Sequence, residues 1–177
     1  MKAGGSFDVV VLGGGSAGLA AAVTAARQGA RTLLLERHGY LGGMGTASLV
    51  HAFCGLYLLR EEPDAVLANP GFATEMAQRM IAATGIGPQR RGRVDVLPQH
   101  PVEFARIADS LVAAEPALDL WLHSEVTAIT GGEDWEIQIA ARSGPVVVRA
   151  RCLVDASGDA MAATLLGSGA STTEAPR

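Results

Sequence analysis

The chain has 177 residues, of which 49% are hydrophobic and 18% are charged, so it can bury one sizeable core and is too apolar for a disordered protein. A net charge of −4 argues against a nucleic-acid-binding surface, and two cysteines exclude a disulfide framework or a zinc site of the usual spacing. We therefore expect a globular, cytoplasmic protein in a reducing environment.

A strand, a glycine turn, a helix and a second strand are predicted near the start, after a flexible N-terminus at residues 1–6. The run Val9–Leu12 is typical of a buried strand, and the turn Gly13–Gly18 fits G-x-G-x-x-G. A helix follows over about 19–28, and the strand Thr32–Leu35 leads to Glu36. The uncharged run that includes this turn is a poor membrane span because glycines interrupt it.

This unit is typical of dinucleotide binding. Gly13 permits the tight turn, Gly15 lets the backbone approach a pyrophosphate, and Gly18 lets the helix pack closely on the strand. The amide groups of Ser16 and Ala17, at the helix N-terminus, add donors for the phosphates. The motif therefore predicts a bound pyrophosphate at this turn.

Glu36 follows the last motif glycine by 18 residues, close to the roughly 20 expected for the acid that binds a ribose. Its carboxylate can accept two hydrogen bonds from a ribose diol and would repel a 2′-phosphate. The next segment, residues 37–46, has glycines at 39, 42, 43 and 45, which excludes a regular helix or strand interior. We expect a loop whose backbone lies against a ligand.

The first unit, the acid after the second strand and the run LGGMGT resemble FAD-dependent oxidoreductases of the glutathione-reductase-like superfamily. The longer run LGGMGTASLVHAFCG is most similar to a broad bacterial family of FAD-dependent oxidoreductases. The resemblance implies that Arg37 packs near the adenine. It also implies that the glycine loop covers the cofactor phosphates, through Gly42, Gly43, Met44 and Thr46.

In that family the next segment runs toward the flavin ring, which makes His51 and Cys54 the weak candidates for catalysis. Their i, i+3 spacing would place them on one helical face. A structural role for each is the alternative, because neither has a visible partner and a free cysteine is commonly a buried hydrophobe. Two such residues do not make a metal site, and none is predicted.

A helical insertion is predicted over about 60–115. It begins with an exposed turn, and a helix then starts at Asn69 and Pro70 and ends at Gly85. The stretch 85–99 is expected to be a loop; its three arginines, Arg90, Arg91 and Arg93, either contact an acidic group or are simply solvated. A second helix is predicted from Pro101, ending before Pro116.

One strand is expected from Leu118 through Ile129, followed by an antiparallel meander over about 130–152. In the resembled superfamily the end of the corresponding strand contacts the adenine through its backbone, which here implies a contact near Val126.

The last motif, LVDASGD at 153–159, resembles the family's D-A-T-G-D segment, with Ser157 in place of threonine. Gly158 permits close approach of the backbone, and Asp159 either binds a cofactor hydroxyl or caps the next helix. Residues 168–177 are predicted to be a flexible tail.

We therefore predict an α/β fold with a Rossmann-like open parallel sheet, an antiparallel β-meander and inserted helices, over residues 7–167. The resemblance covers only the N-terminal part of the family's length and implies the FAD-binding portion of an oxidoreductase acting on a small molecule. A partner chain or a second copy would complete the flavin site; a diverged short form and a truncation are the alternatives. An NAD-binding module and a non-catalytic FAD- or ADP-binding scaffold also remain open.

Overall fold

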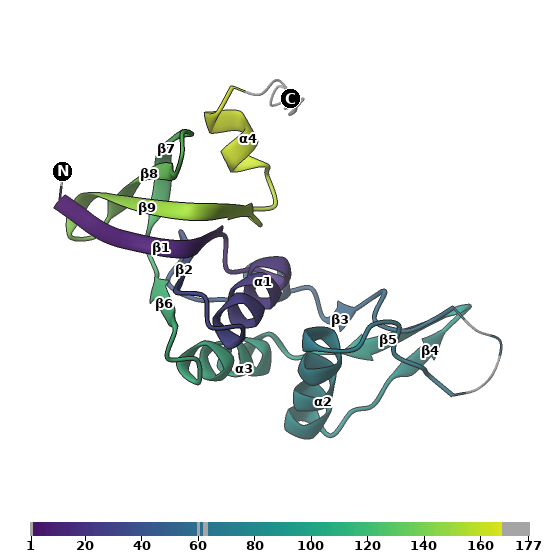
Figure 1. The fold of residues 1–177 in the computed structure, drawn as a ribbon. Coiled ribbons are helices and arrows are strands. Elements are labelled where there is room, and N and C mark those ends of the chain that lie inside the picture. Colours follow the sequence, from purple (N-terminus) through teal and green to yellow (C-terminus); the bar gives the residue numbers. More distant parts are fainter. Residues whose placement is uncertain (1, 60, 62–63, 168–177) are drawn as a thin grey trace. The chain divides into compact units, whose positions relative to one another are not determined.

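The computed structural model describes residues 2–59, 61 and 64–167 (Figure 1). The predicted tail at 168–177 lies outside the described residues. The chain divides into two compact units: the first unit comprises residues 1–40 and 112–177, and the second unit comprises residues 41–111. Each unit has its own set of strands and is described separately.

The first unit opens with the predicted strand, helix and strand. Strand β1 is Lys2–Leu12, helix α1 is Ser16–Arg27 and strand β2 is Thr32–Leu35. β1 and β2 pair in parallel, with Val9 opposite Thr32 and Leu12 opposite Leu35. β1 begins five residues before Phe7, where the folded domain was predicted to start, because its first residues pair with residues 146–149 later in the chain.

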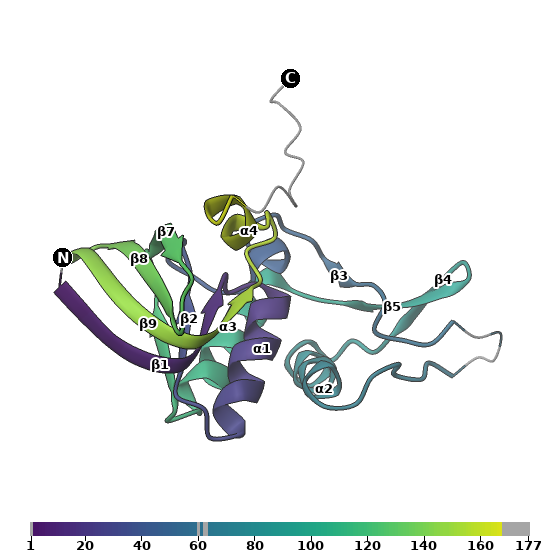
Figure 2. The same ribbon diagram turned by 45° about the horizontal axis from the view of Figure 1, so that its top comes forward.

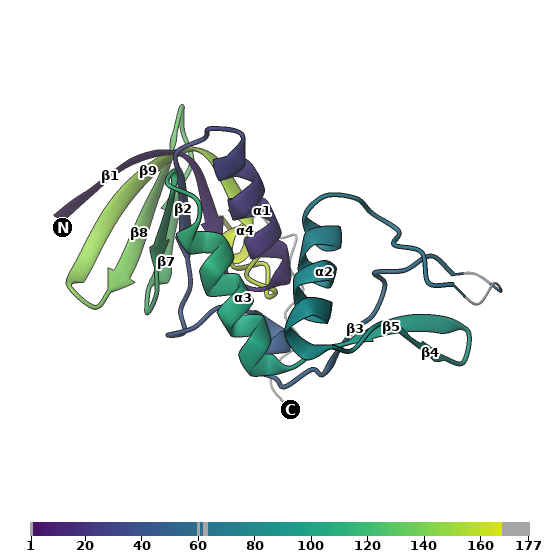
Figure 3. The same cartoon turned by 90° about the horizontal axis from the view of Figure 1, so that it is seen from below.

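A six-stranded sheet forms the centre of the first unit, in the order β6-β2-β1-β9-β8-β7. β6 (Leu118–Trp121), β2, β1 and β9 (Gly144–Asp155) run parallel. β8 (Trp135–Ala141) and β7 (Glu125–Thr130) add an antiparallel edge. Figure 3 shows β2, β1, β9, β8 and β7 fanning out beside α1. The predicted α/β class with a parallel sheet and a meander is confirmed.

Two strand boundaries differ from the prediction. The strand expected over 118–129 is two strands, β6 and β7, on opposite edges of the sheet. His123 has a positive φ of 51°, and its N–H donates to the carbonyl of His38, so the chain leaves the strand direction here. At the other end of the meander, β9 is one continuous strand and supplies both the meander and the apolar segment before Asp155.

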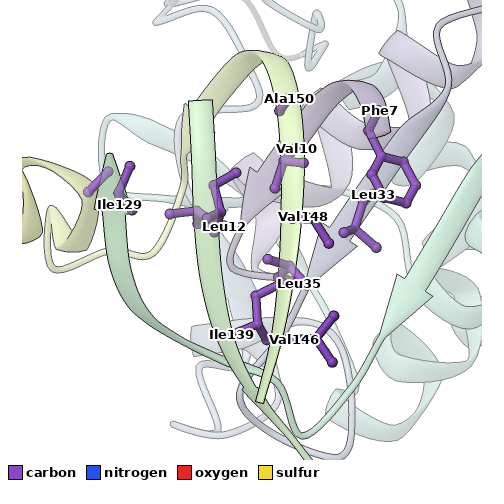
Figure 4. Close-up of a cluster of buried hydrophobic side chains, with 12 residues drawn as sticks. Phe7, Val10, Leu12, Leu33, Leu35, Ile129, Ile139, Val146, Val148 and Ala150 are labelled. Carbon is purple, nitrogen blue, oxygen red and sulfur yellow. The ribbon is translucent and has the colours of Figure 1, made fainter. Parts of the chain in front are cut away.

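The core of the first unit collects apolar side chains from one face of these strands (Figure 4). Val10 and Leu12 of β1 lie in this cluster with Ile137, Ile139 and Val148 of the meander strands. Successive strand residues point to opposite faces, so Val11 faces the other side, where α1 lies against β1 and β2. Burial of β1 on both faces explains its continuous apolar run.

The second unit contains the glycine loop and a small antiparallel sheet. Its elements are a 3₁₀ turn at Gly43–Gly45, β3 (Ala52–Phe53), α2 (Phe72–Thr84), β4 (Gln89–Arg91) and β5 (Val94–Pro98). The three strands are labelled in Figure 2, and their order in the sheet is β3-β5-β4. Helix α3 (Pro101–Ala113) carries the chain back into the first unit, where the short helix α4 (Met161–Leu165) is the last element among the described residues.

Two expectations for the second unit are wrong. The predicted loop at 85–99 contains the β4–β5 hairpin, since Arg90 pairs with Asp95 and Arg91 with Val94. The helix expected from Pro70 begins two residues later, at Phe72, after Gly71. Gly71 adopts a φ of 81° at the N-cap, and the carbonyl of Asn69 accepts a hydrogen bond from the Thr74 hydroxyl. Asn69 is therefore not the N-cap.

Candidate functional site

The glycine turn between β1 and α1 packs against the turn that follows β9. Gly13 has a φ of 94°, and a Cβ there would lie 2.6 Å from the carbonyl oxygen of Ala156. A Cβ at Gly18 would lie 1.7 Å from the carbonyl oxygen of Gly13. Both positions therefore require glycine, and the two requirements together hold the start of α1 against the ends of β1 and β9.

The N-terminus of α1 leaves backbone donors free. The first bond of the helix runs from the N–H of Leu19 to the carbonyl of Gly15, so the N–H groups before it have no intrahelical acceptor. Ser16 and Ala17 are exposed, no side chain of the described residues caps this end, and the first turn of the helix holds no acidic residue. The positive end of the helix dipole is therefore open to an anion.

Glu36 lies at the end of β2, beside this turn, and is 6% exposed. Its two carboxylate oxygens accept hydrogen bonds from the N–H groups of Gly14 and His38, at 2.7 Å each. These charge-assisted bonds fix the direction of the carboxylate. A carboxylate has about four acceptor positions, so roughly two remain for a ligand such as a ribose diol.

Arg37, which follows β2, and Asp159, which follows β9, lie within reach of each other. Their side chains form an ion pair at 3.8 Å and are 58% and 65% exposed. An exposed pair of this kind contributes little to stability. Its relevance is positional, since both charged groups lie at the carboxyl edge of the parallel strands, where ligands bind in open α/β sheets.

Asp155, which the sequence analysis did not single out, organises the turn after β9. One carboxylate oxygen accepts from the Ser157 hydroxyl at 2.6 Å and from the Ser157 N–H at 3.0 Å, and the other accepts from the Ala162 N–H at 2.8 Å. The Ser157 hydroxyl oxygen accepts from the Met161 N–H. These two side chains cap α4, so among the described residues the capping role considered for Asp159 falls to them.

Partial burial raises the pKa of the Asp155 carboxyl, but hydrogen bonds from Ser157, Ala162 and Ala163 together outweigh burial and hold that pKa below its ordinary value. Gly158 follows in the same turn with a φ of 83°. A tight Asp-x-Ser turn at the end of a strand is the signal from which this cap could have been predicted.

In the second unit, the glycine loop presents a second group of free amides. Gly42 and Gly43 have positive φ values of 111° and 54°, and in the described part of the chain the N–H groups of Gly42, Gly43 and Met44 have no hydrogen-bond partner. The Thr46 hydroxyl donates to the carbonyl of Leu41 at 2.9 Å, and a longer contact of 3.1 Å reaches the carbonyl of Gly43. Consecutive free amides of this kind form an anion-binding nest, whereas Thr46 stabilises the loop from within.

The weak catalytic candidates lie in the second unit as well. His51 and Cys54 flank the two residues of β3 and are both exposed, so the helical face expected for them is wrong. Val126 lies on β7, opposite Ile139, and is partly buried against the core of the first unit. It therefore does not lie at the end of the strand from residue 118, which was the reason for choosing it.

The comparison with protein families identifies the chain. A family model described as FAD dependent oxidoreductase matches residues 8–174. The chain belongs to this family. Its cofactor is FAD, and the resemblance to the N-terminal FAD-binding portion of such oxidoreductases is confirmed.

Curated relatives are longer than this chain. An uncharacterized protein of Mycobacterium tuberculosis and one of Mycobacterium bovis are each 36% identical over 99 residues. The matched region covers 51% of this chain and 18% of each relative. The chain therefore matches less than a fifth of the length of these proteins.

Solved structures share the fold. OxyS anhydrotetracycline hydroxylase from Streptomyces rimosus has a TM-score of 0.66 at 19% identity, over 92% of this chain and 34% of that one. THI4 from Thermovibrio ammonificans has a TM-score of 0.62 at 18% identity, over 95% and 64%. Glycine oxidase from Geobacillus kaustophilus has a TM-score of 0.59 at 18% identity, over 94% and 59%.

Among the helices that the structure describes, none has the length and apolar character needed to span a bilayer. Among the described residues as a whole, no group of three or more His, Cys, Asp and Glu side chains is placed to hold a metal ion.

Proposed function

We propose that this chain is the FAD-binding portion of a flavin-dependent oxidoreductase that acts on a small molecule. The observation that carries the proposal is the position of Glu36, held by backbone amides beside the free N-terminus of α1 in a chain of this family. When bound, the flavin ring supplies the hydride or electron transfer, and the protein supplies binding and orientation.

The adenosine diphosphate half of the cofactor suits the first unit. The amides of Gly15, Ser16 and Ala17 would hold the pyrophosphate, and Glu36 would accept hydrogen bonds from the adenosine ribose. Arg37 would pack near the adenine. The fit is supported by Gly13 and Gly18, where any side chain would collide with the backbone that shapes the turn.

The remaining predicted contacts are distributed over both units. Ser157, Gly158 and Asp159 in the first unit and the amides of Gly42–Met44 in the second unit are assigned to the cofactor as well. For Ser157 the assignment is limited to its backbone carbonyl, because its hydroxyl bonds Asp155 and Met161 and its N–H donates to Asp155. Thr46 acts through the loop that it stabilises.

A further polypeptide or a second copy of this chain is proposed to complete the flavin site. The proposal is supported by apolar side chains exposed in the second unit, such as Met44 at 69%, Leu49 at 60% and Leu59 at 66%. Co-purification from the native source, followed by mass analysis, tests this point. Recovery of the chain alone, as a monomer of 18.2 kDa, would contradict it.

The ribose contact is tested by comparing ADP with 2′-deoxy-ADP. Hydrogen bonds to a charged group contribute roughly 1.5–3 kcal/mol, so we expect the wild type to bind ADP about 10-fold to 100-fold more tightly. In Glu36→Gln this preference should fall toward unity. The ratio is independent of a general loss of affinity, which matters because Glu36 also holds Gly14 and His38.

Glu125→Gln is the matched control, since Glu125 is exposed on β7 of the same unit. It should keep the wild-type preference for ADP. An equal affinity of the wild type for the two nucleotides would show that Glu36 does not bind the ribose. Failure of the wild type to bind FAD at all would overturn the proposed function.

A further inference from the structure

Gln99 is a buried polar residue with no role in the site described above. It lies between β5 and α3 in the second unit and is 6% exposed. Its backbone N–H donates to the carbonyl of His51 at 2.9 Å. This contact joins the start of α3 to the segment that follows the glycine loop.

The side-chain amide of Gln99 makes two further bonds to the same segment. Its Nε2 donates to the carbonyl of Gly45 at 2.9 Å and to the carbonyl of Val50. Its Oε1 is buried and has no partner among the described residues. The orientation of the amide is nevertheless settled, because the opposite orientation would place Oε1 against two carbonyl oxygens.

The glycine loop is seated on the same elements. A Cβ at Gly45 would lie 2.4 Å from the ring of Phe104, which is fully buried on α3 and meets Phe53 edge to face at 5.2 Å. The loop is therefore packed against α3 at Gly45, and Gln99 joins the end of the loop at Gly45 to Val50 in the segment that follows it. The carbonyls of Gly45 and Val50 are bonded, whereas the amides at 42–44 have no partner among the described residues.

We propose that Gln99 is a positioning residue, which holds the Gly42–Thr46 loop in the shape that presents its free amides to the cofactor phosphates. The inference rests on the proposed function, because it assumes that this loop binds FAD. Gln99 itself does not touch the cofactor. It acts through the carbonyls of Gly45 and Val50, and only a side chain with two donors on one atom can satisfy both.

Two variants of the full chain test the proposal. Gln99→Leu keeps the bulk and removes both donors. Gln99→Glu is nearly isosteric, but its carboxylate oxygens would repel the two carbonyls at neutral pH, whereas the protonated acid has an O–H that can donate to one of them. Gln78→Leu and Gln78→Glu, at an exposed position on α2 of the same unit, are the matched controls.

The first readout requires no ligand. In Gln99→Leu the amides of Gly45–Val50 should exchange hydrogen at least ~10-fold faster than in the wild type, since the loop loses two bonds to its support. The second readout is affinity for FAD, which should fall by at least ~10-fold in both Gln99 variants. In Gln99→Glu the affinity should recover as the pH is lowered and the carboxyl takes up a proton, whereas Gln99→Leu and the Gln78 variants should show no such recovery.

Unchanged exchange in Gln99→Leu would overturn the proposal, as would faster exchange with undiminished FAD affinity. If the wild type binds neither FAD nor ADP, the proposed function fails and Gln99 has no cofactor loop to position. The exchange readout would still report whether Gln99 holds the loop, so the two failures are distinguishable.

Discussion

Two carboxylates at the ends of parallel strands are fixed by backbone amides. Glu36 ends β2 and accepts from Gly14 and His38; Asp155 ends β9 and accepts from Ser157 and Ala162. In both cases the charge orders the turn that follows its strand. The two carboxylates differ in position. Glu36 lies beside the N-terminus of α1, where backbone amides are free, whereas Asp155 accepts hydrogen bonds that cap α4.

Asp155→Asn should therefore weaken the first unit in a pH-dependent manner. The pKa of Asp155 is lower in the folded chain than in the unfolded one, so its contribution is present above its unfolded pKa of about 3.9 and is lost as the pH falls through the folded pKa. At pH 7 we expect a loss of about 1 kcal/mol in the free energy of unfolding, as for a lost helix cap.

Urea denaturation of wild type and variant at a series of pH values measures this difference, which should shrink as the pH is lowered below about 4. Asp119→Asn, on an exposed position of β6, should behave as the wild type at every pH. A difference between wild type and Asp155→Asn that stays constant down to the lowest pH would assign the effect to shape and not to charge.

At the scale of elements, the β4–β5 hairpin shows how a basic loop becomes ordered. Gly92 is the first residue of the two-residue turn and has a positive φ of 63°, whereas the φ of Arg93 is not positive. A positive φ at the first turn residue alone is typical of a type II′ turn. Across the pair, Arg90 forms a bidentate contact with Asp95, at 2.7 and 3.0 Å. The side chain of Asp95 is only 5% exposed, and Arg90 is the ion-pair partner that the structure gives it.

Arg90→Met should destabilise the second unit by about 1–3 kcal/mol, because it leaves the Asp95 carboxylate buried without its main donor. Arg91→Met makes the same chemical change one residue away, where the guanidinium is exposed and contacts Gln89, and should cost less than ~0.5 kcal/mol. Urea unfolding and hydrogen exchange of the β3–β5 amides measure both effects. Equal losses in the two variants would contradict the role given to the Arg90–Asp95 pair.

Across the whole molecule, the parts that were predicted correctly are those in which neighbouring residues determine the result. The strand, turn and helix around Gly13–Gly18 follow from local pattern, as does the strand Thr32–Leu35, whose bounds were predicted without error. The break at His123 was missed because it depends on a bond to His38, which is distant in sequence. The β4–β5 hairpin was missed because three arginines and a glycine favour a loop, and in β5 three consecutive residues, Asp95–Leu97, are buried, so no alternation of exposed and buried positions marks the strand.

The candidate site divides in the same way. Glu36 was predicted from its spacing, but its two amide partners could not be predicted. Gly14 lies in the turn before α1, 22 residues away, and His38 lies in the loop that follows Glu36. Gln99 carries no local signal at all: its role depends on the carbonyls of Gly45 and Val50, about fifty residues away. Such contacts appear only when the chain is folded.

The two groups of free amides, one in each unit, lead to a final prediction. If both bind the cofactor pyrophosphate, ADP should slow hydrogen exchange at 15–17 in the first unit and at 42–44 in the second unit, whereas adenosine should slow exchange only around Glu36, including the Gly14 amide that donates to it. Adenosine has the ribose diol but no phosphate, so it can engage the carboxylate without either amide group. Hydrogen exchange followed by NMR, at saturating concentrations of each ligand, separates these cases. Protection of 15–17 by ADP with no change at 42–44 would remove the glycine loop from the phosphate site, and protection of 42–44 by adenosine would show that the loop responds to something other than phosphate.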